Sequence, residues 1–167
     1  MSQATEIRAV SKSAAGDHVQ GEKWATFWLA EEIFALRVED VQEVLMQQPL
    51  TPVPLAPEHV VGLLNLRGQI MPAIDLRRRL QLPERGEAGW FLLVLKSEDR
   101  SFAVVVDQIG DVLELPVADW RPPPPTLAAA HRSFVFAICP SESHVVLGLR
   151  VERLSDEDAA LRGGQPS

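Results

Sequence analysis

Short stretches in which hydrophobic and polar residues alternate, separated by Gly and Pro, occupy most of the chain. Alternation of this kind is typical of half-buried β-strands. Two of the intervals between stretches are short enough to be hairpin turns, one holding Glu31 and Glu32 and the other Arg67 and Gly68. The pattern predicts strands at residues 24–29, 33–36, 60–66, 69–75, 91–95, 102–106, 109–115, 134–138 and 145–151.

Helical spacing is confined to short segments. Asp75 is placed to cap a short helix over residues 77–80, and the Ala-containing stretch 151–161 favours a terminal helix. Residues 38–45 have apolar side chains at i, i+3, i+6 and i+7. This spacing predicts a helix of about two turns, with Glu43 just outside the apolar stripe formed by Val38, Val41, Val44 and Leu45.

Pro-rich segments separate these elements. The stretch 49–57 is excluded from helices and central strands because each Pro lacks a backbone donor. The Pro run at 122–125 is typical of a stiff, exposed spacer. Many short strands with few helices predict a mainly β chain, built as small antiparallel barrels or as a sandwich. A nucleotide-binding sheet of alternating strands and helices is excluded.

Chain length and composition narrow the possibilities further. The 167 residues correspond to one domain, or to two small ones that share a core. We expect a flexible N-terminal tail over residues 1–22, a folded domain over 23–155 and a short helix or tail over 156–167. The net charge of −7 disfavours nucleic-acid binding, and no apolar run reaches the roughly 18 residues that span a bilayer. A single cysteine, Cys139, forms no internal disulfide, which fits a reducing cytoplasm.

No constellation of residues points to catalysis. Phosphate-binding, dinucleotide-binding and nucleophile-elbow motifs are absent from the sequence, and the acidic residues are scattered. Cys139 lacks neighbours that would activate a thiolate, and no His has a second His or Cys at metal-ligand spacing. Arg77, Arg78 and Arg79 would point about 100° apart on a helix, so a solvated helix face is favoured over a phosphate site. We therefore expect no enzymatic activity, no cofactor and no metal site.

Binding through a surface remains, and each candidate residue has a simpler interpretation beside it. Arg67 is either an ordinary turn residue in water or a guanidinium that a rigid turn presents to a partner's carboxylate. Glu43 is either solvated or at the rim of a hydrophobic groove. Val41, judged by its spacing alone, fits the core better than an interface.

Several segments resemble the family of CheW-like chemotaxis coupling proteins. The segments include Val-Gln-Glu-Val at 41–44, Gly-Leu-Leu-Asn-Leu-Arg-Gly at 62–68, Met-Pro-Ala-Ile-Asp-Leu-Arg at 71–77 and Val-Asp-Gln-Ile-Gly-Asp-Val-Leu at 106–113. Three signatures within them are specific in combination: Val-Gln-Glu-Val, Asn-Leu-Arg-Gly at 65–68 and the segment 106–113. Their order and spacing match the family over about residues 23–154. The chain departs from the family pattern at 146–154, where the last strand contains Gly148 and Arg150, and in the longer Pro run.

The resemblance implies two small five-stranded antiparallel β-barrels that share a hydrophobic core, with a few short helices. It also implies a non-catalytic cytoplasmic adaptor that couples the tip of methyl-accepting chemoreceptors to a CheA-type histidine kinase in membrane-associated arrays. The receptor tip, a helical hairpin, is expected in a groove between the barrels. By motif position, and with no kinase-contact residue assigned, the receptor-facing residues are Val41, Glu43, Gly62, Asn65 and Arg67.

Other interpretations remain beside this one. A scaffold that kept the fold but binds a small ligand would need a closed polar pocket with converging ionisable groups, and the sequence contains no such cluster. Nucleic-acid binding by small barrels would need a basic face with exposed aromatic residues. Within the adaptor interpretation, swimming, twitching and biofilm or surface-sensing pathways are all compatible with the residues.

Overall fold

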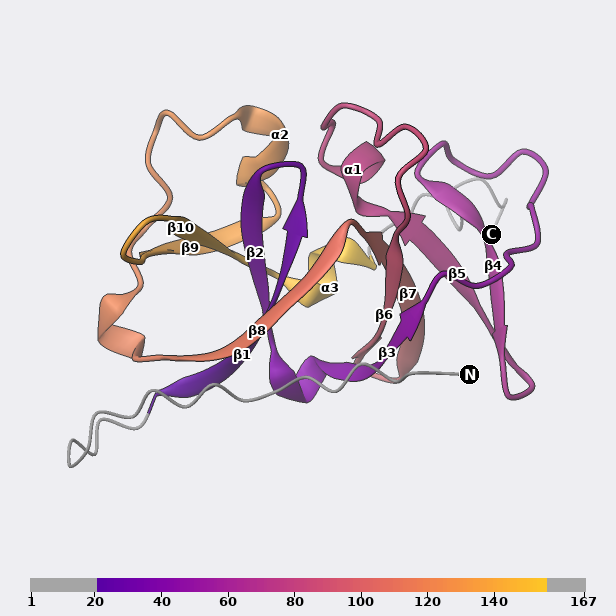
Figure 1. Ribbon diagram of the computed structural model, residues 1–167, viewed down its shortest axis with the longest axis horizontal. Helices are drawn as coiled ribbons and strands as arrows, with labels where there is room; N and C mark the ends of the chain where they lie inside the picture. Colours follow the sequence, from indigo (N-terminus) through magenta and orange to yellow (C-terminus); the bar gives the residue numbers. More distant parts are fainter. Residues whose placement is uncertain (1–20, 156–167) are drawn as a thin grey trace, which may run out of the picture.

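Two five-stranded β-sheets account for most of the computed structural model, which describes residues 21–155 (Figure 1). Sheet I has the strand order β8-β1-β2-β10-β9. Its strands are β1 (Glu22–Leu29), β2 (Glu32–Arg37), β8 (Gln108–Leu115), β9 (Val135–Pro140) and β10 (Val145–Leu149). Sheet II has the order β3-β6-β7-β5-β4. Its strands are β3 (Val41–Met46), β4 (Val60–Leu66), β5 (Gln69–Asp75), β6 (Phe91–Ser97) and β7 (Arg100–Val106).

Only short helical segments join the strands in the described part of the chain. They are the 3-10 turns η1 (Val38–Asp40) and η2 (Val117–Asp119) and the helices α1 (Leu76–Arg79), α2 (Ala129–Arg132) and α3 (Val151–Leu154). Asp75 caps α1 as predicted, because its side chain accepts a hydrogen bond from the Arg77 backbone N–H at 3.0 Å. None of these helices has the length and apolar character needed to cross a membrane.

The hydrophobic residues divide into three clusters, which explains how two small sheets form one stable unit. The largest cluster lies between the sheets and takes Phe27 and Phe34 from sheet I, Leu93 and Phe102 from sheet II, and Leu154 from α3. Smaller clusters fill the other face of each sheet. The expectation of two β units that share a hydrophobic core is therefore confirmed.

The two sheets have the same connectivity, circularly permuted. In each sheet an antiparallel hairpin (β1–β2 or β6–β7) is flanked on one side by an antiparallel strand (β8 or β3). On the other side lies a parallel strand (β10 or β5), followed by an antiparallel one (β9 or β4). Sheet II uses five consecutive strands, whereas sheet I combines β1 and β2 with β8, β9 and β10. A four-residue helix follows the parallel strand in both, α1 after β5 and α3 after β10.

The sheets differ from the predicted antiparallel barrels in two respects. Each contains one parallel pair, β2 with β10 and β5 with β7. In the described residues, the edge strands are joined across the barrel by an isolated bridge and not by a continuous ladder. Thr51, after β3, pairs with Leu63 of β4, and Arg121, after β8, pairs with Ile138 of β9. Alternation of side chains reports which residues are buried but not the direction of neighbouring strands, so neither feature was readable from the pattern.

The predicted helix over residues 38–45 is wrong. Only η1 is helical, and β3 begins at Val41. Between Val41 and Glu43 the strand contains a β-bulge, so that Val41 lies opposite Leu95 and Val44 opposite Leu93. The extra residue places Val41 and Val44 on the same face although they are three positions apart. A strand with a bulge therefore produces the apolar spacing that is usually taken as helical.

The end of the chain also differs in part from expectation. The last strand ends at Leu149, two residues earlier than predicted, and α3 begins at Val151. That start agrees with the predicted terminal helix, but the rest of the predicted helix lies outside the described residues. The predicted N-terminal tail lies outside them as well, except that Gly21 and Glu22 are described and Glu22 begins β1.

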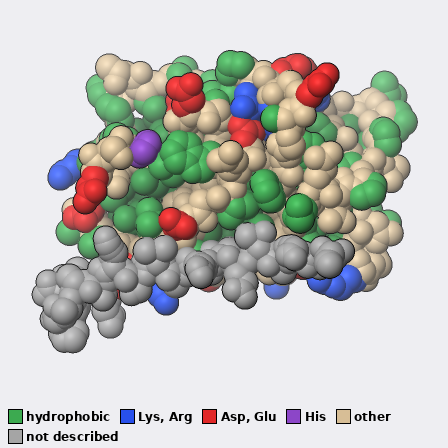
Figure 2. All heavy atoms as spheres, viewed as in Figure 1, with side chains coloured by type: hydrophobic (Ala, Val, Ile, Leu, Met, Phe, Trp, Pro, Cys, Tyr) green, Lys and Arg blue, Asp and Glu red, His purple; other side chains and the backbone are tan. Residues whose placement is uncertain are grey.

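Charged side chains are distributed over the surface in small groups. On the face shown in Figure 2, acidic and basic side chains are interspersed with hydrophobic ones, and the described residues form no continuous basic stripe. A basic stripe is the electrostatic footprint of nucleic-acid binding. This face therefore lacks that footprint.

Replacing Gly62 tests the closure of sheet II. A Cβ at this buried position would lie 2.9 Å from both Leu50 Cβ and Thr51 O. Thr51 and Leu63 form the closing bridge with N···O distances of 3.0 and 2.8 Å. We expect Gly62→Ala to lower the free energy of unfolding by about 1–3 kcal/mol, measured by urea denaturation. Gly89→Ala is the matched control, because the nearest atom to its Cβ is Gln47 Oε1 at 4.0 Å, and equal losses in both variants would contradict the prediction.

Candidate functional site

The hairpin between β4 and β5 holds Arg67 in a fixed position. Arg67 and Gly68 are the two central residues of the turn, with φ values of +53° and +86°. Positive φ at both positions is typical of the type I′ turn that suits a two-residue β-hairpin. Asn65 Oδ1 accepts a hydrogen bond from the Gly68 N–H at 3.1 Å, and this bond stabilises the turn. The left-handed backbone at Arg67 costs about 1 kcal/mol for a residue with a side chain.

Arg67 forms a bidentate ion pair with Glu43 of β3, the strand at the opposite edge of sheet II. Its two terminal nitrogens donate to the two carboxylate oxygens of Glu43, at 2.9 and 2.7 Å. This is the planar match that distinguishes Arg from Lys in carboxylate binding. The hydrogen bond from Arg67 lowers the pKa of the Glu43 carboxyl below its ordinary value, so the pair is charged at neutral pH.

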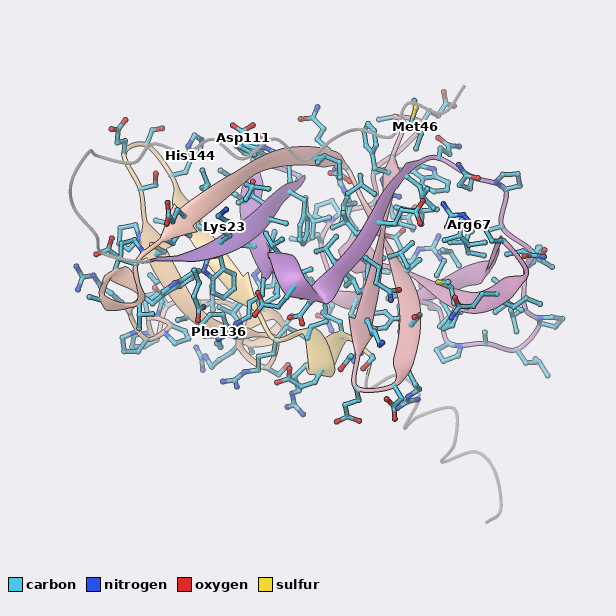
Figure 3. The ribbon with its side chains drawn as sticks, turned by 90° about the horizontal axis from the view of Figure 1, so that it is seen from below. Lys23, Met46, Arg67, Asp111, Phe136 and His144 are labelled. Carbon is cyan, nitrogen blue, oxygen red and sulfur yellow. The ribbon has the colours of Figure 1, made fainter. Side chains whose placement is uncertain are left out.

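The pair is at the surface and lies over a shallow hollow. The Arg67 side chain is 70% exposed and that of Glu43 is 29% exposed. The hollow has a volume of about 300 Å³, and besides the ion pair it is lined by Gln42, Leu66, Gln69, Met71 and Val94. In Figure 3, Arg67 lies at the opposite end of the molecule from His144. The arrangement combines a fixed charge pair with a small apolar floor, which suits binding and contains no reactive group.

The five residues expected to face a receptor do not all occupy one surface. Glu43, Asn65 and Arg67 come together around the turn. Val41 is the half-buried first residue of β3 and packs against the shared core. Gly62 is buried beneath the segment that closes sheet II, so its contribution to the surface is to let that segment approach.

The geometry of the charges differs from the expected groove between two barrels. All residues that line the hollow belong to sheet II or to its β4–β5 turn. Glu43 and Arg67 do not face each other across an opening; they are bonded directly. The family motifs grouped Glu43 with Arg67, and the structure places the two side chains in contact. The motifs do not predict the β3 bulge and the β4–β5 turn that set the distance between these side chains.

A buried ion network at the junction of the sheets was not anticipated. Asp107 lies in the one-residue link between β7 and β8 and accepts hydrogen bonds from Arg77 Nε at 3.1 and 3.0 Å. It also accepts from the Ala30 backbone N–H of the β1–β2 turn at 2.7 Å. Arg85 Nε donates to Asp107 at 3.2 Å, and its terminal nitrogens donate to Asp75 at 3.3 and 3.2 Å. The four side chains are only 9–15% exposed.

The network corrects the interpretation of Arg77 as part of a solvated helix face. A four-residue helix that follows a buried strand has no fully solvated face, because its first turn is held against the sheet. The signal that could have found the network is a charged residue directly after an apolar run, as Asp75 follows β5 and Asp107 follows β7. Both lie in motifs that carry the family resemblance.

No metal-binding cluster occurs within residues 21–155. No group of three or more His, Cys, Asp or Glu side chains in this range is placed to hold a metal ion. Cys139 is buried, and burial raises the pKa of its thiol, with Asp119 adding to the effect. A raised pKa keeps sulfur as the poorly nucleophilic thiol.

Replacing Asp107 tests whether its charge holds the two sheets together. Asp107→Asn keeps the shape but leaves two guanidiniums without their shared carboxylate. We expect the free energy of unfolding at pH 7, measured with urea, to fall by about 1–3 kcal/mol. Asp111→Asn is the control, since Asp111 is an exposed acid on β8, and a similar loss there would contradict the assignment.

Comparing Asp107→Asn with the unchanged chain also tests how the free energy of unfolding depends on pH. Burial raises the pKa of Asp107, but hydrogen bonds from Arg77, the Ala30 N–H and Arg85 outweigh it, and the net pKa is below the ordinary value. Stability from this group is present above the unfolded pKa of about 4 and is lost as the pH falls through the lower folded pKa. The difference between Asp107→Asn and the unchanged chain should therefore narrow below about pH 4. A constant difference down to pH 3 would contradict this.

Comparisons with known proteins agree with the fold and the motifs. A family model described as "CheW-like domain" matches residues 23–159. The chain is 28% identical over 134 residues to the chemotaxis protein CheW of Treponema pallidum (strain Nichols), covering 77% of this chain and 79% of the relative. It is 29% identical over 159 residues to the chemotaxis protein CheW of Klebsiella aerogenes, covering 93% of each.

A solved structure gives the same result in three dimensions. The crystal structure of the scaffolding protein TtCheW from Thermoanaerobacter tengcongensis superposes with a TM-score of 0.73 at 29% identity. The match covers 78% of this chain and 89% of that one. The family match spans both sheets, and with them the Glu43–Arg67 pair and the buried network. The chain belongs to the CheW-like domain family.

Proposed function

We propose that this chain is a non-catalytic cytoplasmic adaptor that couples methyl-accepting chemoreceptors to a CheA-type histidine kinase. Membership of the CheW-like family supports the class of function. The exposed Glu43–Arg67 ion pair is the observation that supports a receptor contact at this surface. On this proposal, Val41, Glu43, Asn65 and Arg67 form or position the receptor-binding surface, and Gly62 acts by closing the sheet beneath it.

The chemistry of the pair suits the polar tip of a helical hairpin. Arg67 uses two of its five N–H groups on Glu43, and the remaining three have no partner among the described residues. A guanidinium already fixed in place can donate these groups to a carboxylate or to carbonyl oxygens at a helix end with little loss of side-chain entropy. Of the apolar residues that line the adjacent hollow, Leu66 is half-buried, whereas Met71 and Val94 are buried, so polar contacts through Arg67 would dominate binding here.

Rigidity of the surface supports an adaptor role. The turn is fixed by Asn65, the strand by its bulge, and the two sheets by the Asp107 network. An adaptor transmits information by holding its partners in a fixed relative geometry, so a stiff body is needed more than a deep pocket. The proposal places the protein at membrane-associated arrays through its partners and without insertion of its own.

Binding to both partners is the direct test. We expect the full chain to retain a receptor cytoplasmic fragment and a CheA-type kinase in separate pull-down experiments, and all three proteins to elute together. Binding to neither partner would refute the proposed function. Retention of the kinase alone would refute the receptor surface while leaving the scaffold role.

Charge reversal tests the role of the ion pair. We expect Arg67→Glu to weaken binding of the receptor fragment about tenfold or more, because it removes the donor and places two acids side by side. Since Arg67 is at the surface, circular dichroism should remain unchanged. Lys96→Glu is the matched control, an exposed charge reversal on the same sheet that should leave affinity unchanged.

A swapped pair separates two roles of the charges. In the double variant Glu43→Arg with Arg67→Glu, the ion pair can form again with opposite polarity. If the receptor contacts Arg67 directly, affinity should stay low, as in the single variant. Full recovery of affinity would show that the pair only shapes the turn, and would contradict direct contact.

A further inference from the structure

Residues from distant parts of the chain meet in a hollow at one end of sheet I. β2 and β10 run parallel, so their carboxyl ends lie at the same edge and are followed there by η1 and α3. The hollow, which we call the α3 hollow, has a volume of about 400 Å³, within the range of small-molecule sites. Its lining includes Trp24, Arg37, Asp40, Phe136, Arg150 and Glu152. No sequence motif contains this group of ionisable residues, because only the fold brings them together.

Gly148 explains the aromatic floor of the α3 hollow. A Cβ at Gly148 would overlap Phe136 Cε1 and lie 2.9 Å from Trp120 Cζ3, so glycine lets both rings pack on β10. The Phe136 ring centroid is 5.6 Å from that of Trp24 and 5.1 Å from that of Trp120. Trp24 is buried, whereas Phe136 is half-buried. The departure from the family pattern at Gly148 therefore gives the hollow a packed aromatic floor that is open in part at Phe136.

The charges that line the α3 hollow nearly balance. Two guanidinium groups, of Arg37 and Arg150, accompany three carboxylates, of Glu39, Asp40 and Glu152. Neither sign dominates, so neither a simple anion nor a simple cation finds a strongly complementary site. A ligand that carries both charges close together is the better match.

Only part of this charge is used within the protein. The Arg37 guanidinium lies 5.7 Å from the centroid of the Trp24 ring and pairs with Glu22 at 3.4 Å and Glu39 at 3.5 Å. Within residues 21–155, the side chains of Asp40, Arg150 and Glu152 form no hydrogen bond or ion pair. One guanidinium and two carboxylates in the same hollow are therefore available to a ligand.

Two further groups of the lining have unmet interactions. Burial, and then Glu39, raise the pKa of the Asp40 carboxyl, and Arg37 reverses this only in part. An ammonium group beside Asp40 would favour its charged form. Trp24 adds a buried Nε1 that has no hydrogen-bond partner among the described residues, which gives the wall a second donor without an acceptor.

We propose that the α3 hollow binds a zwitterionic α-amino acid with an apolar or aromatic side chain. The ligand carboxylate accepts hydrogen bonds from the Arg150 guanidinium in bidentate geometry. The ligand ammonium group donates to Asp40 or Glu152, and the ligand side chain packs on the open part of the Phe136 ring. Nucleotides and other polyanions fit poorly, because three carboxylates line the same hollow. In Figure 3, Phe136 lies far from Arg67, so this site is separate from the proposed receptor surface.

Titration of the full, isotopically labelled chain with L-phenylalanine tests the site by proton–nitrogen correlation spectra. We expect saturable shifts of the backbone amides of Asp40, Arg150 and Glu152, with a Kd of roughly 0.1–10 mM for a ligand of this size. The amides of Arg67 and Gly68 should stay in place. The absence of saturable shifts, or saturable shifts only outside the α3 hollow, would overturn the proposal.

Analogues that lack one charge test recognition of the zwitterion. Phenylpropanoate lacks the ammonium group, and phenylethylamine lacks the carboxylate. We expect each to bind about fivefold or more weakly than phenylalanine, because each leaves one set of protein charges without a partner. Equal affinity of phenylalanine and either analogue would contradict this recognition.

Two variants connect each end of the ligand with its residue. Arg150→Gln should weaken phenylalanine binding about fivefold or more and leave phenylethylamine binding unchanged, since the amine has no carboxylate for Arg150. Glu152→Gln should weaken phenylalanine binding without weakening that of phenylpropanoate. Both side chains are exposed, so the fold should be retained and the amide spectrum should remain dispersed.

Lys96→Gln and Glu114→Gln are the matched controls, because each removes an exposed charge from a strand outside the α3 hollow. They should leave the affinity for all three ligands unchanged. An equal loss of all three ligands in Arg150→Gln, or losses in the controls as large as in the site variants, would overturn the assignment.

Discussion

The relative position of the two sheets depends on one carboxylate. Asp107 occupies the single-residue link between the last strand of sheet II and β8 of sheet I, where the chain has no length in which to adjust. Its oxygens accept from Ala30 in sheet I and from Arg77 and Arg85 in sheet II. Replacing Arg77 or Arg85 leaves a poorly solvated charge, which costs more than the pair itself contributes. The ion network therefore works mainly as a constraint on geometry, while the shared hydrophobic cluster supplies most of the stability.

The candidate binding surface is built on that constraint by three local devices. The bulge in β3 turns Glu43 toward the β4–β5 hairpin, the left-handed turn presents Arg67, and Gly62 allows the Thr51 segment to close the sheet beneath both. Each device has a local energetic cost, in backbone strain or in an interrupted ladder. Each places an exposed group on rigid structure, where ordering it for a partner costs little. That combination is typical of a recognition surface.

The sequence predicted the strands well because most of them have one face in a core. Alternation located the hairpins around Glu31 and Arg67, and Asp75 marked the start of α1. The prediction was wrong at Val41, because a bulge gives a strand the apolar spacing of a helix. It was also wrong at Arg77, because the periodicity of a helix does not show that the Asp107 carboxylate packs against it. The parallel pairs and the closing bridges were not readable, since they depend on residues far apart in the chain. Family motifs grouped Glu43 with Arg67, but only the structure shows the direct hydrogen bonds between them.

Circular permutation of the sheets has a consequence for synthesis of the chain on the ribosome. Every strand of sheet II lies between residues 41 and 106, so this sheet can fold as soon as β7 has emerged. The hairpin β1–β2 emerges earlier, but the strands on both its sides, β8 and β10, are made last. Until then the apolar side chains of Phe27 and Phe34 have only sheet II to cover them. The nascent protein thus depends on its middle portion as a template, and a chain that stops before β10 leaves β2 without its parallel partner strand.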